Sequence, residues 1–125
     1  MARPQATLAL LLLVFCFSRP PEATSTNNGK LLFFTAPWCE PCHKMKPLLA
    51  NLAKKYKVQM IPVDFDSSPP EVQDFKVDSL PTIVLLDSKG QLVLRAEGAS
   101  KQTMNALTTA LKTLEMRKAN SSQGR

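Results

Sequence analysis

Two cysteines three positions apart, Cys39 and Cys42, have the residue type and the spacing of a reactive thiol pair. Thiols at this spacing can form a disulfide with each other and reopen it, which is what reversible thiol–disulfide exchange requires. The preceding run Leu31–Thr35 is apolar and aromatic and predicts a buried strand, while Pro41 suits the first turn of a helix. A strand-to-helix junction would place Cys39 at a helix N-terminus, where free N–H groups and the helix dipole favour the attacking thiolate.

Cys42 and Trp38 complete this predicted site. Cys42 follows Cys39 by one helical turn on the same face, so we expect it to resolve the mixed disulfide that Cys39 forms. Trp38 directly precedes Cys39 and would shield the pair while offering a substrate a flat apolar surface. A disulfide that closes such a small loop would add almost no stability, so the pair indicates chemistry and not a structural cross-link.

The sequence Trp38-Cys39-Glu40-Pro41-Cys42 resembles the motif of the thioredoxin family, and three further features match that family in order. Pro47 lies five residues after Cys42, inside the predicted helix, where the family has a kinking proline. Leu80-Pro81-Thr82 lies where the family carries a cis-proline that faces the cysteines. Gly98 matches a family glycine after the last strand, and the resemblance extends roughly over residues 30–114.

The resemblance implies an enzyme, a protein-disulfide oxidoreductase that serves cell redox homeostasis. Cys39 would be the nucleophile and Cys42 the resolving cysteine of the redox-active disulfide. The implied substrate-binding residues are Trp38, Pro41, Leu80 and Pro81. A cis bond before Pro81 would bring the Leu80 backbone close to the cysteines, where it could pair with an extended client. The resemblance implies no bound cofactor and no metal, with electrons supplied by a partner reductase or a small thiol.

Glu40 departs from the family pattern, which most often has glycine at that position. A carboxylate about 6 Å from Cys39 would disfavour the thiolate by roughly 0.7 kcal/mol in water, whereas the helix end favours it by about 0.3–1 kcal/mol. His43 and Lys44 would offset part of the Glu40 effect. We hypothesise that Glu40 and His43 tune the thiols, and that Glu40 moderates the acidity of Cys39 and favours a reducing pair. The alternative is an ordinary first-turn acid.

Phe33 is the second departure from the family pattern. Typical thioredoxins have a buried aspartate at the matching strand position, which helps to move the proton of the resolving cysteine. The lysine that often pairs with that aspartate is replaced by Pro62. Losing both groups is self-consistent, because either one alone would be an unpaired buried charge. The sequence therefore predicts that Cys42 resolves the mixed disulfide slowly near neutral pH, for want of a general base.

Other functions stay open on the sequence alone. The main alternative is a redox-poor binding module, chaperone or subunit that holds client proteins on the apolar surface around Trp38 and Pro81. The string Cys39–His43 also reads C-x-x-C-H, which is a signature of c-type haem attachment. A zinc site built on the same string lacks an evident fourth ligand. Pro41 argues against an iron–sulfur cluster that bridges two chains.

Residues 1–23 have the pattern of an N-terminal targeting segment. An unbroken run of ten apolar residues, Leu8–Phe17, follows Arg3, and no acidic residue precedes Glu22. This pattern is typical of a cleaved secretory signal peptide, and the run is too short to span a bilayer. We therefore expect a protein of the secretory pathway or the extracellular space, with no stable membrane span in the mature chain. A mitochondrial presequence is the alternative. Cleavage would also remove Cys16.

Charge and composition limit the range of partners. The formal net charge is +6, and the densest basic cluster, Lys54-Lys55-Tyr56-Lys57, is typical of a solvated helix end. Basic and aromatic residues do not interleave as they do in nucleic-acid-binding proteins, so no nucleic acid is expected. We expect a monomer whose partners are protein disulfide substrates and an electron donor.

The elements that must hold the site alternate along the chain. Strands are predicted over 30–35, 58–65, 82–86 and 91–96, and helices over 39–56, over a short segment ending near Phe75, and from a cap at Ser100 through Leu114. The apolar face of the first long helix would comprise Met45, Leu48, Leu49, Leu52 and Tyr56.

This order of elements predicts an α/β fold, in which a thioredoxin-like four-stranded mixed sheet is flanked by helices on both faces. The N-terminal strand and helix of full-length thioredoxins would be missing. We place the domain at residues 30–116, between a linker over 24–29 and a flexible tail over 117–125.

Overall fold

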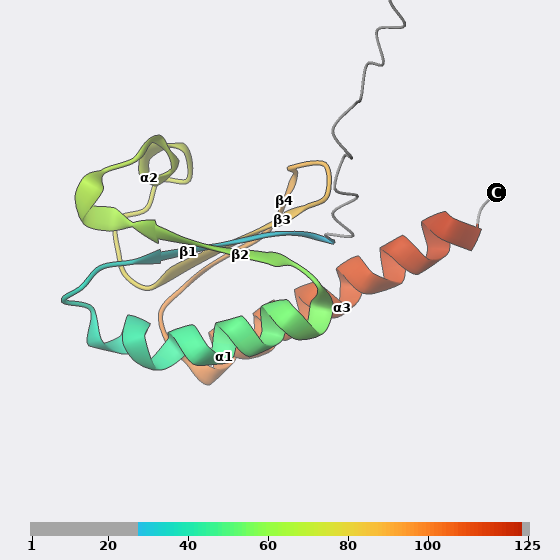
Figure 1. The fold of residues 1–125 in the computed structure, drawn as a ribbon, viewed down its shortest axis with the longest axis horizontal. Coiled ribbons are helices and arrows are strands. Elements are labelled where there is room, and N and C mark those ends of the chain that lie inside the picture. The colour runs from blue at the N-terminus through green and yellow to red at the C-terminus, as the bar shows by residue number, and fades with distance from the viewer. Residues whose placement is uncertain (1–27, 124–125) are drawn as a thin grey trace, which may run out of the picture.

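The computed structural model describes residues 28–123, and its elements follow the predicted order of strands and helices (Figure 1). The strands are β1 (Gly29–Thr35), β2 (Gln59–Asp64), β3 (Thr82–Asp87) and β4 (Leu92–Glu97). The helices are α1 (Glu40–Tyr56), α2 (Pro70–Asp74) and α3 (Lys101–Gln123), with a short 3-10 turn, η1 (Phe65–Ser67), after β2. The predicted targeting segment at 1–23, and with it the question of an N-terminal strand and helix, lies outside the described residues.

The four strands form one mixed sheet in the order β2-β1-β3-β4. β1 runs parallel to β2, antiparallel pairing joins β1 to β3 and β3 to β4, and Phe33 is in register with Pro62 and with Ile83. Pro62 cannot donate an N–H to a ladder, and its position on β2 at the edge of the sheet fits that restriction. The predicted four-stranded mixed sheet is confirmed.

Helices cover both faces of the sheet, as predicted. α1 and α3 lie on one face and α2 lies on the other (Figure 1). Successive residues of β1 point to opposite faces, so Leu31 and Phe33 belong to the cluster under α1 and α3, while Leu32 and Phe34 belong to the cluster near α2. Phe33 and Phe34 are both fully buried. The strand that precedes the cysteines is therefore anchored in two cores at once.

Helix α1 carries the second cysteine and begins where the sequence predicts. Cys39 is its N-cap, Pro41 lies in its first turn, and Lys57 ends it in a left-handed conformation with φ 55°. Its buried residues are Cys42, Met45, Leu49, Ala53 and Tyr56, which recur at helical spacing. Leu48 was also predicted to lie on this buried face, but 52% of its surface is exposed. Its position is at the margin of the face, where α1 borders a groove.

Helix α3 is longer than the sequence predicts. Ser100 caps it, because its Oγ accepts the N–H of Thr103 at 3.1 Å, and Leu107, Leu111 and Leu114 are buried at helical spacing. The helix continues to Gln123, so the predicted tail at 117–125 is helical over most of its length and 116 is not a structural boundary. Neither proline nor glycine interrupts the sequence before Gly124, which explains the continuation. Among residues 28–123, no helix is both long enough and apolar enough to cross a membrane.

Candidate active site

Cys39 and Cys42 are joined by a disulfide at the N-terminus of α1. The S–S distance is 2.06 Å and the two Cα atoms are 5.3 Å apart. The two residues differ in access, because Cys39 keeps 4% of its surface exposed whereas Cys42 is fully buried. The little surface that the pair leaves open to solvent therefore belongs to Cys39. This asymmetry matches the predicted division into an attacking and a resolving cysteine.

The backbone around the pair holds Cys39 by three hydrogen bonds. Its N–H donates to the Ala36 carbonyl at 3.1 Å, and its carbonyl accepts the N–H of His43 at 3.3 Å. Its Sγ accepts the backbone N–H of Cys42 at 3.3 Å. When the disulfide is open, an N–H directed at Sγ from a helix N-terminus favours the charged thiolate. The N-cap position thus prepares Cys39 for nucleophilic attack.

Trp38 stands beside the pair with two-thirds of its surface open to solvent. The exposed fraction of Trp38 is 66%, and its indole N–H donates to both carboxylate oxygens of Asp66, at 3.1 and 3.0 Å. Asp66 lies in η1, where its own N–H donates to the carboxylate of Asp64. Asp66 was not among the predicted site residues. The parallel pairing of β1 with β2 is the signal that could have found it, because both strands end at the same edge of the sheet.

Leu80 and Pro81 lie in the segment that leads into β3. The peptide bond between them is cis, Pro81 is buried, and the Pro81 carbonyl accepts the N–H of Gly98 at 2.8 Å. Leu80 packs against the same apolar cluster that contains both cysteines. Within residues 28–123, no hydrogen bond occupies the backbone groups of Leu80. An extended peptide could therefore pair with them, as a client strand would at a free edge.

The surroundings of Cys42 are apolar. Its cluster includes Phe33 from β1, Met45 and Leu49 from α1, and Leu107 from α3, and none of its buried members in the described part of the chain carries a carboxylate, an imidazole or an amine. Phe33, at the position where the resemblance leads us to expect an aspartate, is in register with Pro62, where the resemblance leads us to expect a lysine. Within residues 28–123, this cluster thus offers Cys42 no carboxylate or imidazole as a general base when the pair is reduced. That water or a departing thiolate takes the proton of Cys42 stays a prediction.

Glu40, His43 and Lys44 are exposed on the first turns of α1. The His43 ring bonds to the Pro37 carbonyl at 2.9 Å through Nε2, which therefore carries the proton. His43 thus fixes the loop that precedes Cys39, and this contact was not predicted. The tuning roles of Glu40 and His43 stay predictions. Within residues 28–123, no three His, Cys, Asp or Glu side chains gather where they could hold a metal ion.

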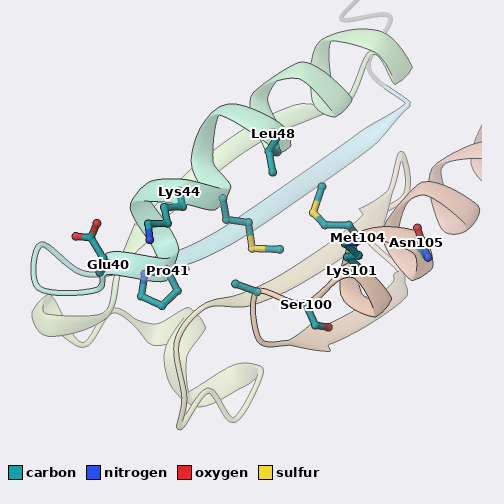
Figure 2. A pocket seen from close by; sticks show the side chains of 10 residues that line it. Glu40, Pro41, Lys44, Leu48, Ser100, Lys101, Met104 and Asn105 are labelled. Carbon is teal, nitrogen blue, oxygen red and sulfur yellow. The ribbon is translucent and has the colours of Figure 1, made fainter.

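A groove of about 680 Å³ adjoins the redox motif between α1 and the start of α3 (Figure 2). Its lining residues are Glu40, Pro41, Lys44, Met45, Leu48, Ala99, Ser100, Lys101, Met104 and Asn105. In Figure 2, Leu48 and Met104 point toward one another across the gap between the two helices. Of these residues, only Pro41 was predicted to bind a substrate, and Glu40 was predicted to tune the thiols. The groove depends on how the two helices are placed, which no local sequence pattern records.

Comparisons with known proteins agree with this geometry. The profile of the thioredoxin family matches residues 22–113. Thioredoxin H5 of Arabidopsis thaliana is 38% identical over 85 residues, which cover 67% of this chain and 71% of the relative. An oxidised mitochondrial thioredoxin 3 from Saccharomyces cerevisiae superimposes with a TM-score of 0.58 at 31% identity, covering 68% of this chain and 80% of its own. A mutant thioredoxin from Halobacterium salinarum gives a TM-score of 0.62 at 27% identity, with coverages of 74% and 79%.

Proposed function

This chain belongs to the thioredoxin family of thiol–disulfide oxidoreductases, and on that premise we propose that it reduces disulfides in client proteins, with Cys39 attacking and Cys42 resolving. The observation that carries this assignment of roles is the asymmetry of the disulfide at the N-terminus of α1. Cys39 is the N-cap and retains exposed surface, while Cys42 is fully buried. A nucleophile must reach its substrate, and a resolving thiol needs to reach only Cys39.

The reaction proceeds by two exchanges. The Cys39 thiolate attacks one sulfur of the client disulfide, so that a Cys39–client bond forms while the client's S–S bond breaks and its second sulfur leaves as a thiolate. Cys42 then loses its proton and attacks the Cys39 sulfur. The client leaves with two thiols, and the electrons have come from the Cys39–Cys42 pair, which is now oxidised. A reductase dithiol or a small thiol must reduce that pair again.

We propose that the client is held in an extended conformation beside the disulfide. The free backbone groups of Leu80 support this, since they can pair with a client strand. The exposed ring of Trp38 and the exposed Pro41 supply apolar surface on either side of Cys39. Pro81 acts indirectly, because its buried ring and its hydrogen bond to Gly98 fix the segment that contains Leu80.

Insulin reduction with dithiothreitol as the electron source tests this function. We expect the full chain to accelerate precipitation of the insulin B chain well beyond dithiothreitol alone. The control is the double variant Cys39→Ser, Cys42→Ser, which should match dithiothreitol alone. Equal rates of insulin precipitation for the wild-type protein and the double variant would contradict the proposal. They would favour a scaffold that holds clients without reducing them.

We also propose that the protein acts as a monomer in the secretory pathway after cleavage of residues 1–23. Support comes from the apolar run Leu8–Phe17 and from the removal of Cys16 with that segment, which would leave the redox pair as the sole thiols. N-terminal sequencing of protein secreted by cells that express the full chain tests the cleavage. If the protein is recovered from the mitochondrial matrix instead, residues 1–23 act as a mitochondrial presequence.

A further inference from the structure

The groove between α1 and α3 is continuous with the redox site. Glu40 and Pro41, which separate the two cysteines in the sequence, form one end of its lining (Figure 2). Its volume of about 680 Å³ is within the usual range for sites that take a ligand or several side chains. A client whose disulfide reaches Cys39 therefore has its flanking residues within reach of the groove.

The floor of the groove is apolar and adaptable. Met45 is almost fully buried, Met104 packs partly against the main core, and Leu48 remains 52% exposed. Methionine side chains are flexible and polarisable, so a surface that contains two of them accommodates apolar groups of different shapes. Half-exposed Leu48 would lose contact with water if an aliphatic side chain were placed between it and Met104. The floor thus fits an aliphatic client residue.

The sides of the groove carry a positive balance of charge. Lys44 from α1 and Lys101 from α3 line it together with a single acid, Glu40. Arg95 and Glu97 form the one ion pair among residues 28–123, so neither lysine has a carboxylate partner in the described structure. Two unpaired ammonium groups at an apolar groove complement an occupant that has both an aliphatic side chain and a carboxylate.

We propose that this groove binds the client segment next to the reacting cysteine, and that it selects segments with an aliphatic residue and an acidic residue there. The proposal rests on the proposed function, because the groove has this role only if Cys39 attacks clients. It assigns Leu48, Met104 and Lys101 as specificity residues for the exchange reaction.

Peptides whose one cysteine is bonded to nitrothiobenzoate supply the probe. Every full chain in this experiment, including the one called wild-type, carries Cys16→Ser so that Cys16 cannot release colour itself. The Cys39 thiolate of the pre-reduced protein attacks the peptide sulfur, the peptide–nitrothiobenzoate bond breaks, and the coloured nitrothiobenzoate thiolate leaves. Cys42 then releases the peptide as a thiol. One peptide carries leucine and glutamate on both sides of its cysteine; a second has serine in place of leucine, and a third has glutamine in place of glutamate. The measurement is the second-order rate constant for colour release with each peptide.

The apolar arm compares Leu48→Ser with Leu92→Ser. Leu92 is a matched control, because it is 57% exposed and lies on β4 outside the groove. The wild-type protein should prefer the leucine peptide over the serine peptide by about tenfold, the usual effect of a small apolar contact on discrimination. Leu48→Ser should abolish most of that preference, and Leu92→Ser should leave it intact. Urea unfolding of both reduced variants checks that they are folded, because unfolded chain exposes its thiols to either peptide and would itself lower the preference.

The charged arm compares Lys101→Gln with Lys112→Gln, a change at an exposed lysine of α3 outside the groove lining. Lys101→Gln should reduce the preference for the glutamate peptide over the glutamine peptide by about two- to fivefold at low salt, and added salt should remove the difference. Lys112→Gln should not alter it.

Three outcomes would overturn the groove assignment. The first is a wild-type protein that releases nitrothiobenzoate from all three peptides at equal rates. That result would contradict the groove's role but leave the exchange function intact. Release from none of the peptides would instead contradict the exchange function itself. The second is loss of preference in Leu92→Ser to the same extent as in Leu48→Ser. The third is a wild-type dimer in sedimentation velocity that Leu48→Ser dissociates, because the occupant would then be a second copy of this chain.

Discussion

The two faces of the sheet are built in different ways. The face under α1 and α3 holds the larger apolar cluster, which includes both cysteines and Phe33. The face under α2 holds a smaller one around Phe34, and it is supplemented by hydrogen bonds from a charged side chain. Arg95 donates from Nε to the Phe75 carbonyl and from a terminal nitrogen to the Lys76 carbonyl, both at 2.9 Å. Apolar packing dominates the face under α1 and α3, whereas the face under α2 combines a smaller apolar cluster with these two hydrogen bonds from Arg95.

This difference between the two faces helps to explain why Cys39 and Cys42 have different surroundings. Because Cys42 is fully buried in the larger cluster, it is shielded from outside thiols, and the buried members of that cluster include no carboxylate or imidazole. Cys39, at the rim of the same cluster, borders exposed Trp38 and exposed Glu40. The smaller face contributes indirectly, through Asp66, which bonds Trp38 from the segment after β2. Four experiments separate the contributions of the two faces.

The largest effect should come from exchanging the two cysteines for serine one at a time. Cys39→Ser removes the proposed nucleophile, so insulin reduction should fall to the rate of the reductant alone. Cys42→Ser keeps the nucleophile but removes the resolving thiol, so a Cys39–client adduct should accumulate. Mass spectrometry of samples prepared without reductant should detect this adduct. A Cys39→Ser protein that forms adducts through Cys42 would contradict the difference in access between the two sulfurs.

The next largest effect should come from placing an acid beside Cys42. Phe33→Asp should accelerate resolution of the mixed disulfide by about 10–100-fold over Phe33→Asn, because only the aspartate can act as a general base. Both variants should lower the free energy of unfolding by roughly 2–5 kcal/mol, since a polar group replaces a buried ring. Stopped-flow release of client from a preformed adduct gives the resolution rate, and urea unfolding confirms that each variant is folded.

Phe34→Asp is the matched control for this experiment. Phe34 is the next residue along β1 and is equally buried, but it belongs to the cluster on the opposite face. An acid there should destabilise the protein to a similar extent without accelerating resolution. If Phe33→Asp and Phe33→Asn resolve at the same rate, the missing base is not what limits Cys42.

A smaller effect should follow from removing the polar contacts of the α2 face. Arg95→Ala deletes both hydrogen bonds to the carbonyls that follow α2, and it should lower the free energy of unfolding by about 1–2 kcal/mol. The rate of Cys39 alkylation in the folded protein should not change, since the cysteines belong to the other face. Urea unfolding and alkylation of the same preparations test both statements. Arg117→Ala, at an exposed residue of α3, should remain within about 0.5 kcal/mol of the wild-type protein.

How far the sequence could predict this molecule depended on whether the signal was local. The order of elements followed from apolar periodicity and turn residues, and the cysteine pair followed from a short motif. The hydrogen bond from Trp38 to Asp66 follows from neither of these local signals, because it joins residues 28 apart; finding it requires the parallel pairing of β1 with β2 as well. The exposure of Leu48 and the groove beside it depend on the distance between α1 and α3, which is set by packing of both helices on the sheet.

The smallest expected effect concerns Glu40 and sharpens the comparison of the faces, because each face has a helix with an acid in its first turn. Glu40 begins α1 beside Cys39, whereas Glu71 occupies the first turn of α2 on the opposite face. Repulsion between the Glu40 carboxylate and the Cys39 thiolate, roughly 0.7 kcal/mol at about 6 Å in water, makes the thiolate harder to form. Glu40→Gln removes that repulsion and should lower the midpoint pH of Cys39 alkylation by about half a unit.

Glu71→Gln should leave the alkylation midpoint unchanged, because its carboxylate is near α2 and not near the cysteines. High salt should reduce the difference between Glu40→Gln and the wild-type protein, since exposed charges are screened. The measurement is the rate of iodoacetamide labelling of reduced protein as a function of pH, followed by mass spectrometry that locates the label on Cys39. An unchanged midpoint in Glu40→Gln would mean that Glu40 is an ordinary first-turn acid, and that the helix N-terminus and the amide of Cys42 set the thiol's acidity without it.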